Sequence, residues 1–148
     1  MKLKAILALT CALAIGVIAA GCGGGDDEDS TTTAEITQAD FVAQGNQICA
    51  QANAEIDQAG QQLGDSVDEA TLESFASDTV VPNVQGQIDD IKALGAPDGQ
   101  QAQIDAMLAA AQSGVDALTA DPSQIKDDTL FDDANAKADA IGLTECSG

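Results

Sequence analysis

The sequence contains no histidine, tryptophan, tyrosine or arginine, and these absences exclude several classes of function. Histidine is the commonest general base and the usual protein ligand of zinc, copper and haem. The chain has five lysines against 25 acidic residues, which excludes nucleic acids and phosphate-rich ligands as partners. We therefore expect no enzyme, no catalytic residue and no cofactor or metal site.

Any enzyme built from this chain would depend on carboxylates alone. Three adjacent pairs are the candidates, since two acids can hydrolyse glycosides: Asp89-Asp90, Asp127-Asp128 and Asp132-Asp133. Neighbouring residues on a helix point about 100° apart, so the members of each pair would not face each other. We interpret these pairs as solvated surface.

Calcium is a metal that carboxylates favour, and two acidic stretches are candidates for it. Asp26-Asp27-Glu28-Asp29 can bind calcium weakly, and residues 121–128 form the nearest acidic loop. Neither stretch has the ligand spacing of a twelve-residue calcium loop. A solvated spacer and loose counterion binding are the favoured interpretations.

The N-terminal residues have the pattern of a secretion signal. Lys2 and Lys4 precede an uncharged run from Ala5 to Gly21, which ends in small residues directly before Cys22. The ending Ala19-Ala20-Gly21-Cys22 resembles the lipobox of bacterial lipoproteins, although that family favours leucine at the place of Ala19. The resemblance implies cleavage before Cys22, two acyl chains (such as palmitate) on its sulfur, and stable attachment to the outer face of the cell membrane.

Two alternatives to lipidation remain open, namely ordinary cleavage after an Ala-x-Ala-like site and an uncleaved membrane anchor. Seventeen apolar residues are at the short end of a helix that spans a bilayer. In either case the two lysines stay inside, so the body lies outside the cytoplasm. We expect a signal peptide at 1–21, a lipidated cysteine with a flexible acidic linker at 22–35, and a helical domain at 36–148.

Two cysteines are left for the folded domain. Cys11 leaves with the signal and Cys22 carries the lipid, so Cys49 and Cys146 remain. An even pair in an exported protein indicates a disulfide, which here would close a long loop. A redox-active pair is the alternative, but such pairs are more often Cys-x-x-Cys.

Four segments repeat apolar residues at steps of three and four, which is the period of an amphipathic helix. These stripes are Phe41 to Leu63, Leu72 to Leu94, Ile104 to Leu118, and Phe131 to Ile141. Short connections between them predict an all-α fold, an antiparallel four-helix bundle with a thin, alanine-rich core. Pro82 lies within the second segment, so we expect that helix to be broken near Val80 to Pro82.

Local signals predict where the helices begin and end. Thr37 and Asp40 form a cap for the first helix, and Ser66 with Glu69 can cap the second, which can also begin slightly later. The expected ends are Gly64-Asp65 for the first helix and Asp121-Pro122 for the third. For the fourth, Asp128 or Thr129 is the expected cap, and Gly142 fits the left-handed position past its end, with Leu143 folding back.

Parts of the body resemble small secreted or lipid-anchored helical proteins of high-GC Gram-positive bacteria, a family of uncharacterised function. The resemblance is carried by Phe41-x-x-x-Gly45-Asn46-x-Ile48-Cys49, Leu94-Gly95-Ala96-Pro97 and Gly142-Leu143-Thr144-Glu145-Cys146. It implies an all-helical body and a Cys49–Cys146 bridge. It implies no activity.

Two hypotheses for function follow. The first is a non-enzymatic lipoprotein that binds or spaces an envelope component, with a protein or small-molecule partner that the sequence does not identify. The alternative is a carrier of a small molecule or lipid in a cavity of the bundle. Four residues could line such a groove, although they are better explained as core: Ile88, Ile91, Met107 and Leu108.

Overall fold

The computed structural model describes residues 36–64 and 66–147. The expected signal peptide (1–21), Cys22 and the linker (22–35), with its acidic cluster, lie outside these residues. Over the described residues the fold is helical and contains no strand, which confirms the all-α class.

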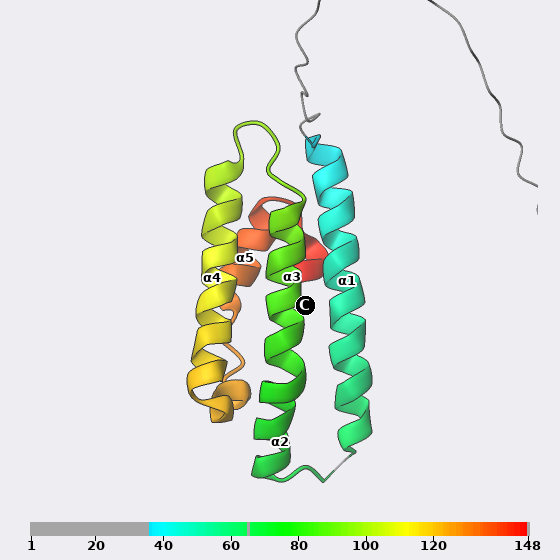
Figure 1. Cartoon of the computed structure of the whole chain (residues 1–148), viewed down its shortest axis with the longest axis vertical. Helices are drawn as coiled ribbons and strands as arrows, with labels where there is room; N and C mark the ends of the chain where they lie inside the picture. Colours follow the sequence, from blue (N-terminus) through cyan, green and yellow to red (C-terminus); the bar gives the residue numbers. More distant parts are fainter. Residues whose placement is uncertain (1–35, 65, 148) are drawn as a thin grey trace, which may run out of the picture. The chain divides into compact units, whose positions relative to one another are not determined.

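Four helical segments make up the described body. The first is α1 (Gln38–Leu63), the second runs through α2 (Glu69–Phe75), η1 (Ala76–Val80) and α3 (Val81–Ala93), the third is α4 (Gln101–Ala120), and the fourth is α5 (Asp132–Ala140). Short 3₁₀ turns follow α4 and α5, namely η2 (Pro122–Lys126) and η3 (Thr144–Cys146). Helices α1, α3 and α4 lie side by side, α5 packs on α4, and η3 packs on α1 (Figure 1).

The predicted cap of α1 and the predicted end of α5 are confirmed. The Thr37 hydroxyl oxygen accepts the Asp40 N–H at 3.1 Å, which satisfies a donor that the helix leaves unpaired. After α5, Gly142 adopts a φ of 90°, and the Leu143 N–H donates to the Ala138 carbonyl at 2.9 Å. This hydrogen bond closes a Schellman turn, so the chain folds back toward α1.

Of the other two predicted helix starts, one is confirmed in its later form and one is wrong. The second helical segment begins at Glu69, slightly later than a Ser66 cap would place it, and its cap is Asp68, whose carboxylate accepts the Thr71 N–H at 2.8 Å. The fourth begins at Asp132, after the expected caps at 128 and 129. Asp127 instead closes a local turn by accepting both the N–H and the hydroxyl of Thr129, which delays the helix.

The second helical segment changes from α-helical to π-helical hydrogen bonding just before Pro82. Residues Ala76–Val80 are π-helical, and the Val81 N–H donates to the Ala76 carbonyl five residues earlier. Val80 and Val81 keep right-handed helical dihedrals, so the expected break is not confirmed. A proline ring clashes with the carbonyl four residues before it, and a wider turn relieves that clash.

The core is thin because the facing helix surfaces carry many small residues. Its main cluster consists of Phe41, Cys49, Ile88, Ile91, Ile104, Met107, Leu108, Val115, Ala138, Ile141 and Leu143. Leu143 is fully buried and packs closely on Gly45, where an added Cβ would lie 2.6 Å from the Leu143 Cδ2 atom. The missing side chain at position 45 therefore lets the C-terminal turn approach α1.

Candidate ligand-binding cavity

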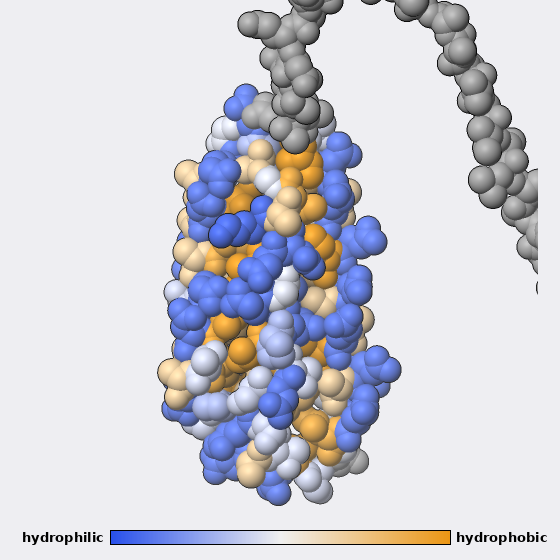
Figure 2. Space-filling model, viewed as in Figure 1, coloured by the Kyte–Doolittle hydropathy of each residue, from blue (hydrophilic) through white to orange (hydrophobic). Residues whose placement is uncertain are grey.

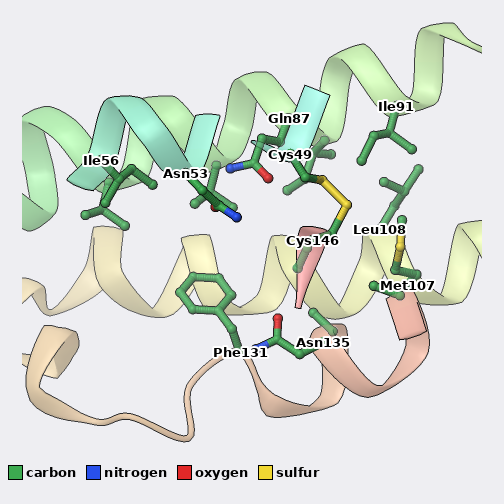
Figure 3. A pocket seen from close by; sticks show the side chains of 16 residues that line it. Cys49, Asn53, Ile56, Gln87, Ile91, Met107, Leu108, Phe131, Asn135 and Cys146 are labelled. Carbon is green, nitrogen blue, oxygen red and sulfur yellow. A yellow bond between two sulfur atoms is a disulfide. The ribbon is translucent and has the colours of Figure 1, made fainter. Parts of the chain in front are cut away.

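The interior contains a cavity of about 240 Å³ among α1, α3, α4 and α5. Sixteen residues line it: Cys49, Asn53, Ile56, Val80, Val84, Gln87, Ile88, Ile91, Met107, Leu108, Ala111, Phe131, Ala134, Asn135, Ala138 and Cys146. Part of this lining is buried and part is partly exposed, so the cavity lies within the core and reaches toward solvent. Figure 3 shows the side chains that enter it from each side.

The four residues singled out as a possible groove do lie together in this lining. Ile88 and Ile91 come from α3, and Met107 and Leu108 come from α4. All four are also buried members of the main core cluster. The two interpretations offered by the sequence therefore coincide, because the same side chains form the core and the cavity wall.

Alanines are the reason why the space remains open. Ala111 projects from α4, and Ala134 and Ala138 project from α5, where a leucine at any of them would extend toward the cavity. The space opens to solvent, because part of its lining is only half-buried. It is a feature of the faces of α4 and α5, since these three lining residues carry only a methyl group.

Phe131 is the aromatic residue of the cavity lining. It comes from the turn before α5, and its ring packs against the backbone of α4 at Gly114. Figure 3 shows the ring directed from its own segment into the space below α1 and α3. Phe131 and Asn135 are four residues apart, so both side chains leave the α5 region on the same face.

The disulfide forms part of the wall. Cys49 of α1 and Cys146 of η3 are bonded, with 4.9 Å between their Cα atoms and 97 residues between them in sequence. Both cysteines line the cavity. The bridge thus ties the C-terminal turn across one side of the space (Figure 3).

Side-chain amides of α1 hold the same C-terminal turn. Asn46 donates to the Gly142 carbonyl at 3.0 Å, and its own carbonyl accepts the Glu145 N–H at 3.0 Å. About two helical turns further along α1, the Asn53 side chain donates to the Glu145 carbonyl at 2.7 Å. These bonds pair backbone groups that no helix supplies with a partner.

No charged side chain lines the cavity. The carboxylate pairs at 89–90, 127–128 and 132–133 are exposed, and the described residues contain no cluster of three or more potential metal ligands. Figure 2 shows hydrophilic residues over much of one face, with apolar residues in the seams between helices. The acidic character therefore belongs to the surface and the apolar character to the interior.

The resolved pKa shifts also belong to the surface. Hydrogen bonds from Thr71 lower the pKa of Asp68, and hydrogen bonds from Thr129 lower the pKa of Asp127. A hydrogen bond to Glu69 raises the pKa of Lys126. Each shift comes from a cap, a turn or an ion pair outside the cavity, so none indicates proton transfer chemistry there.

A second hollow of about 250 Å³ lies between α1 and α3. Glu55, Pro82 and Asp90 are among its lining residues, and Gln87 lines both spaces. The Glu55 carboxylate accepts a hydrogen bond from Asn83 at 3.2 Å. This hollow is polar where the first is apolar.

Sequence reasoning missed Phe131, Asn135 and the disulfide as parts of the wall. A signal for Asn135 exists, since it lies four residues after Phe131 and is polar on an otherwise apolar helix face. The disulfide itself lies where the two remaining cysteines were expected to pair. Its contact with a cavity depends on the packing of four helices, which no local pattern encodes.

Comparison of the chain with protein-family models, curated protein sequences and solved structures finds no match. Within residues 36–64 and 66–147, no helix combines the length and the apolar character that a membrane span requires.

Proposed function

We propose that this protein is a membrane-anchored, extracytoplasmic lipoprotein whose helical body binds a small apolar molecule in its core cavity. The cavity of about 240 Å³ is the observation that carries the proposal. It favours the carrier hypothesis over a purely spacing role, because a spacer has no need of an open interior.

The size of the cavity supports binding of a compact ligand. A cavity of about 150 Å³ lined by Leu, Ile and Phe stays dry and binds benzene. The space described here is larger, so it accommodates roughly one to two fused rings or an aliphatic chain of similar volume. Drug-sized ligands occupy larger pockets, from about 300 Å³ upward.

A binding role without catalysis fits the chemistry of the lining. The wall offers aliphatic side chains, one aromatic ring, a disulfide and three amides, and it offers no ionisable group. General acid–base catalysis needs a group that exchanges a proton near the working pH. In the proposed function the protein binds its ligand and does not catalyse a reaction on it.

The anchor part of the proposal rests on sequence alone. The lipobox-like Ala19-Ala20-Gly21-Cys22 supports lipid on Cys22, and the acidic linker that follows supports a body held away from the bilayer. A disulfide in the body agrees with an oxidising compartment. The membrane is therefore the proposed partner of Cys22, at the outer face of the cell membrane.

The proposed architecture is an antiparallel four-helix bundle with a broken second helix. The reversal of chain direction between consecutive long helices in Figure 1 supports the first point. The π-helical segment Ala76–Val80 beside Pro82 supports the second, since it interrupts the α-helical hydrogen-bond pattern of this segment. Val80 ends that segment and lines the cavity, so a change of conformation in the π-helical turn would move part of the cavity wall.

The test fills the cavity from one position. The Ala111→Leu lipoprotein and the wild-type lipoprotein are purified in lipid nanodiscs, and bound small molecules are extracted and identified by mass spectrometry. Ala109→Leu, on the exposed side of the same helix, is the matched control. We expect a stoichiometric small molecule with wild type and Ala109→Leu and none with Ala111→Leu. Equal recovery from all three proteins would overturn the proposal.

A further inference from the structure

Three side-chain amides enter the apolar cavity from three different helices. Asn53 comes from α1, Gln87 from α3 and Asn135 from α5. Figure 3 shows Asn53 and Gln87 on one side of the space and Asn135 on the opposite side. The polar groups of the lining therefore converge on a common volume.

The hydrogen bonds of these amides leave their oxygen atoms open to a ligand. Asn53 and Gln87 each use the side-chain NH₂ group, toward the Glu145 carbonyl at 2.7 Å and toward the Asn83 side chain at 3.3 Å. No hydrogen bond joins the carbonyl oxygen of either amide, or either end of the Asn135 amide, to another described residue. The cavity thus presents three acceptors, and only Asn135 presents a wholly uncommitted donor group.

The uncommitted carbonyl oxygens and the free amide of Asn135 select the chemistry of the ligand. A group that only accepts, such as an ether, can bond an amide N–H but leaves the carbonyl oxygens unpaired. A hydroxyl both donates and accepts, so it can bond a carbonyl oxygen and the Asn135 NH₂ group together. A buried polar group without its partner is costly, so a hydroxyl gains where a bare hydrocarbon leaves the amides unpaired.

The lining disfavours any charge on the ligand, and the protein's net charge disfavours negative charge a second time. The lining contains no Asp, Glu or Lys to pair with a buried charge. The chain as a whole carries a formal net charge of −20, which repels anions from the surface around the cavity. The interior is therefore suited to a neutral molecule.

We infer that the ligand of this cavity is an uncharged hydroxyl compound with an apolar body of one to two rings, whose hydroxyl is held by Asn135. The inference rests on the proposed function and deepens it, because it names the chemical class that the cavity selects. Asn135 acts as the specificity-determining residue, and Gln87 across the cavity supplies a second acceptor.

The experiment compares four probes that share one apolar body: 2-naphthol, naphthalene, 2-methoxynaphthalene and 2-naphthoate. Because the chain has no tryptophan or tyrosine, their fluorescence is read with little background from the protein. The full lipoprotein is titrated in nanodiscs, and matched nanodiscs with the Ala111→Leu protein give the partitioning of each probe into lipid. Wild type is expected to bind 2-naphthol about tenfold more tightly than naphthalene or 2-methoxynaphthalene. It is expected to bind 2-naphthoate at least about a hundredfold more weakly than 2-naphthol.

Asn135→Leu removes both polar ends of the amide at similar volume. It is expected to reduce the preference for 2-naphthol over naphthalene to about twofold or less, while naphthalene binds as well as before or better. The control Gln103→Leu makes the same kind of change on the exposed face of α4 and is expected to keep the preference. Gln87→Leu, expected to weaken 2-naphthol to a lesser degree, provides a second variant in case Asn135→Leu does not fold.

The outcomes separate the two proposals. Equal binding of naphthalene and 2-naphthol to wild type overturns this inference and leaves the proposed function in place. An unchanged preference for 2-naphthol in both amide variants also overturns it. If none of the four probes binds to wild type, and no small molecule is recovered with it, both the inference and the proposed function are overturned.

Discussion

Phe131 lies directly against the backbone of α4 at Gly114: a Cβ atom placed on Gly114 would come within 2.3 Å of the ring atom Cε1. The ring lines the cavity, and the absence of a side chain at position 114 lets it lie against α4. A second helical glycine, Gly86 of α3, has no atom within 4 Å of its own virtual Cβ. The two positions form a matched pair.

Gly114→Ala is expected to destabilise the protein by about 1 to 3 kcal/mol, because Phe131 must leave its place. Gly86→Ala is expected to stabilise it by about 0.5 to 1 kcal/mol, since alanine has the better helix propensity. Chemical denaturation of the two variants measures both values. Two changes of the same sign would contradict the contact described here.

The disulfide and Asn46 are expected to stabilise the C-terminal turn by different amounts. Removing the bridge with Cys49→Ser and Cys146→Ser frees a loop of 97 residues, which costs about 4 to 5 kcal/mol in the chain-entropy model. Asn46→Ala removes two hydrogen bonds to that turn and is expected to cost about 1 to 3 kcal/mol.

The measurement is the free energy of unfolding with and without reductant. Wild type is expected to lose stability on reduction, and the double serine variant is expected to be insensitive. Two titratable thiols in the body of protein purified without reductant would refute the bridge. The control Gln47→Ala, exposed on α1 beside Asn46, is expected to change stability by less than about 0.5 kcal/mol.

Acid is expected to weaken the cap of α2. The pKa of Asp68 is lowered in the folded state by the Thr71 hydrogen bond, so its contribution is present above the unfolded pKa. That contribution is lost as pH falls through the folded pKa. Asp68→Asn keeps a capping oxygen but does not titrate, so its melting temperature should fall less than that of wild type between about pH 6 and about pH 3.

Asp57→Asn is the control for this acid prediction, since it removes one exposed carboxylate from α1 without removing a cap. Its pH profile is expected to follow that of wild type. Superimposable profiles for Asp68→Asn and wild type would show that the cap makes no titratable contribution. Circular dichroism at a series of pH values supplies the data.

Lipid on Cys22 is a prediction from sequence that mass spectrometry can decide. The mature protein is expected to begin at Cys22 and to carry acyl chains, because the residues before it resemble a lipobox. Cys22→Ala is expected to leave the precursor uncut or to move cleavage to a secondary site. An unmodified N-terminus elsewhere in the wild-type protein would count against the anchor.

The start or end of a helix was predictable from the sequence where only one residue nearby could form the cap. Thr37 and Gly142 have no competing residue beside them for their roles. Thr37 caps α1 and Gly142 takes the left-handed position after α5, as expected. Before the fourth helix the sequence offers two caps, Asp128 and Thr129, and does not rank them. The Asp127 carboxylate accepts hydrogen bonds from both the N–H and the hydroxyl of Thr129, so the helix begins only at Asp132.

The cavity was predictable only in part. Ile88 and Met107 were recognised as residues that line either a core or a groove, because an apolar stripe looks the same in both cases. Whether facing stripes fill the space between them depends on summed side-chain volumes, such as those of Ala111 and Ala138. That sum requires the register between helices, which is a property of the tertiary structure.

The bond between Cys49 and Cys146 also determines how the protein would respond to pulling. A force applied along the chain from the N-terminal side passes through residues 36–48 and then crosses the bridge to the C-terminal end. The loop of 97 residues between the two cysteines is bypassed, so it cannot add to the extended length while the bond is intact. Stretched by its two ends, the body would lengthen only by the short stretches outside the loop, and within the cavity lining the force would pass through the disulfide alone.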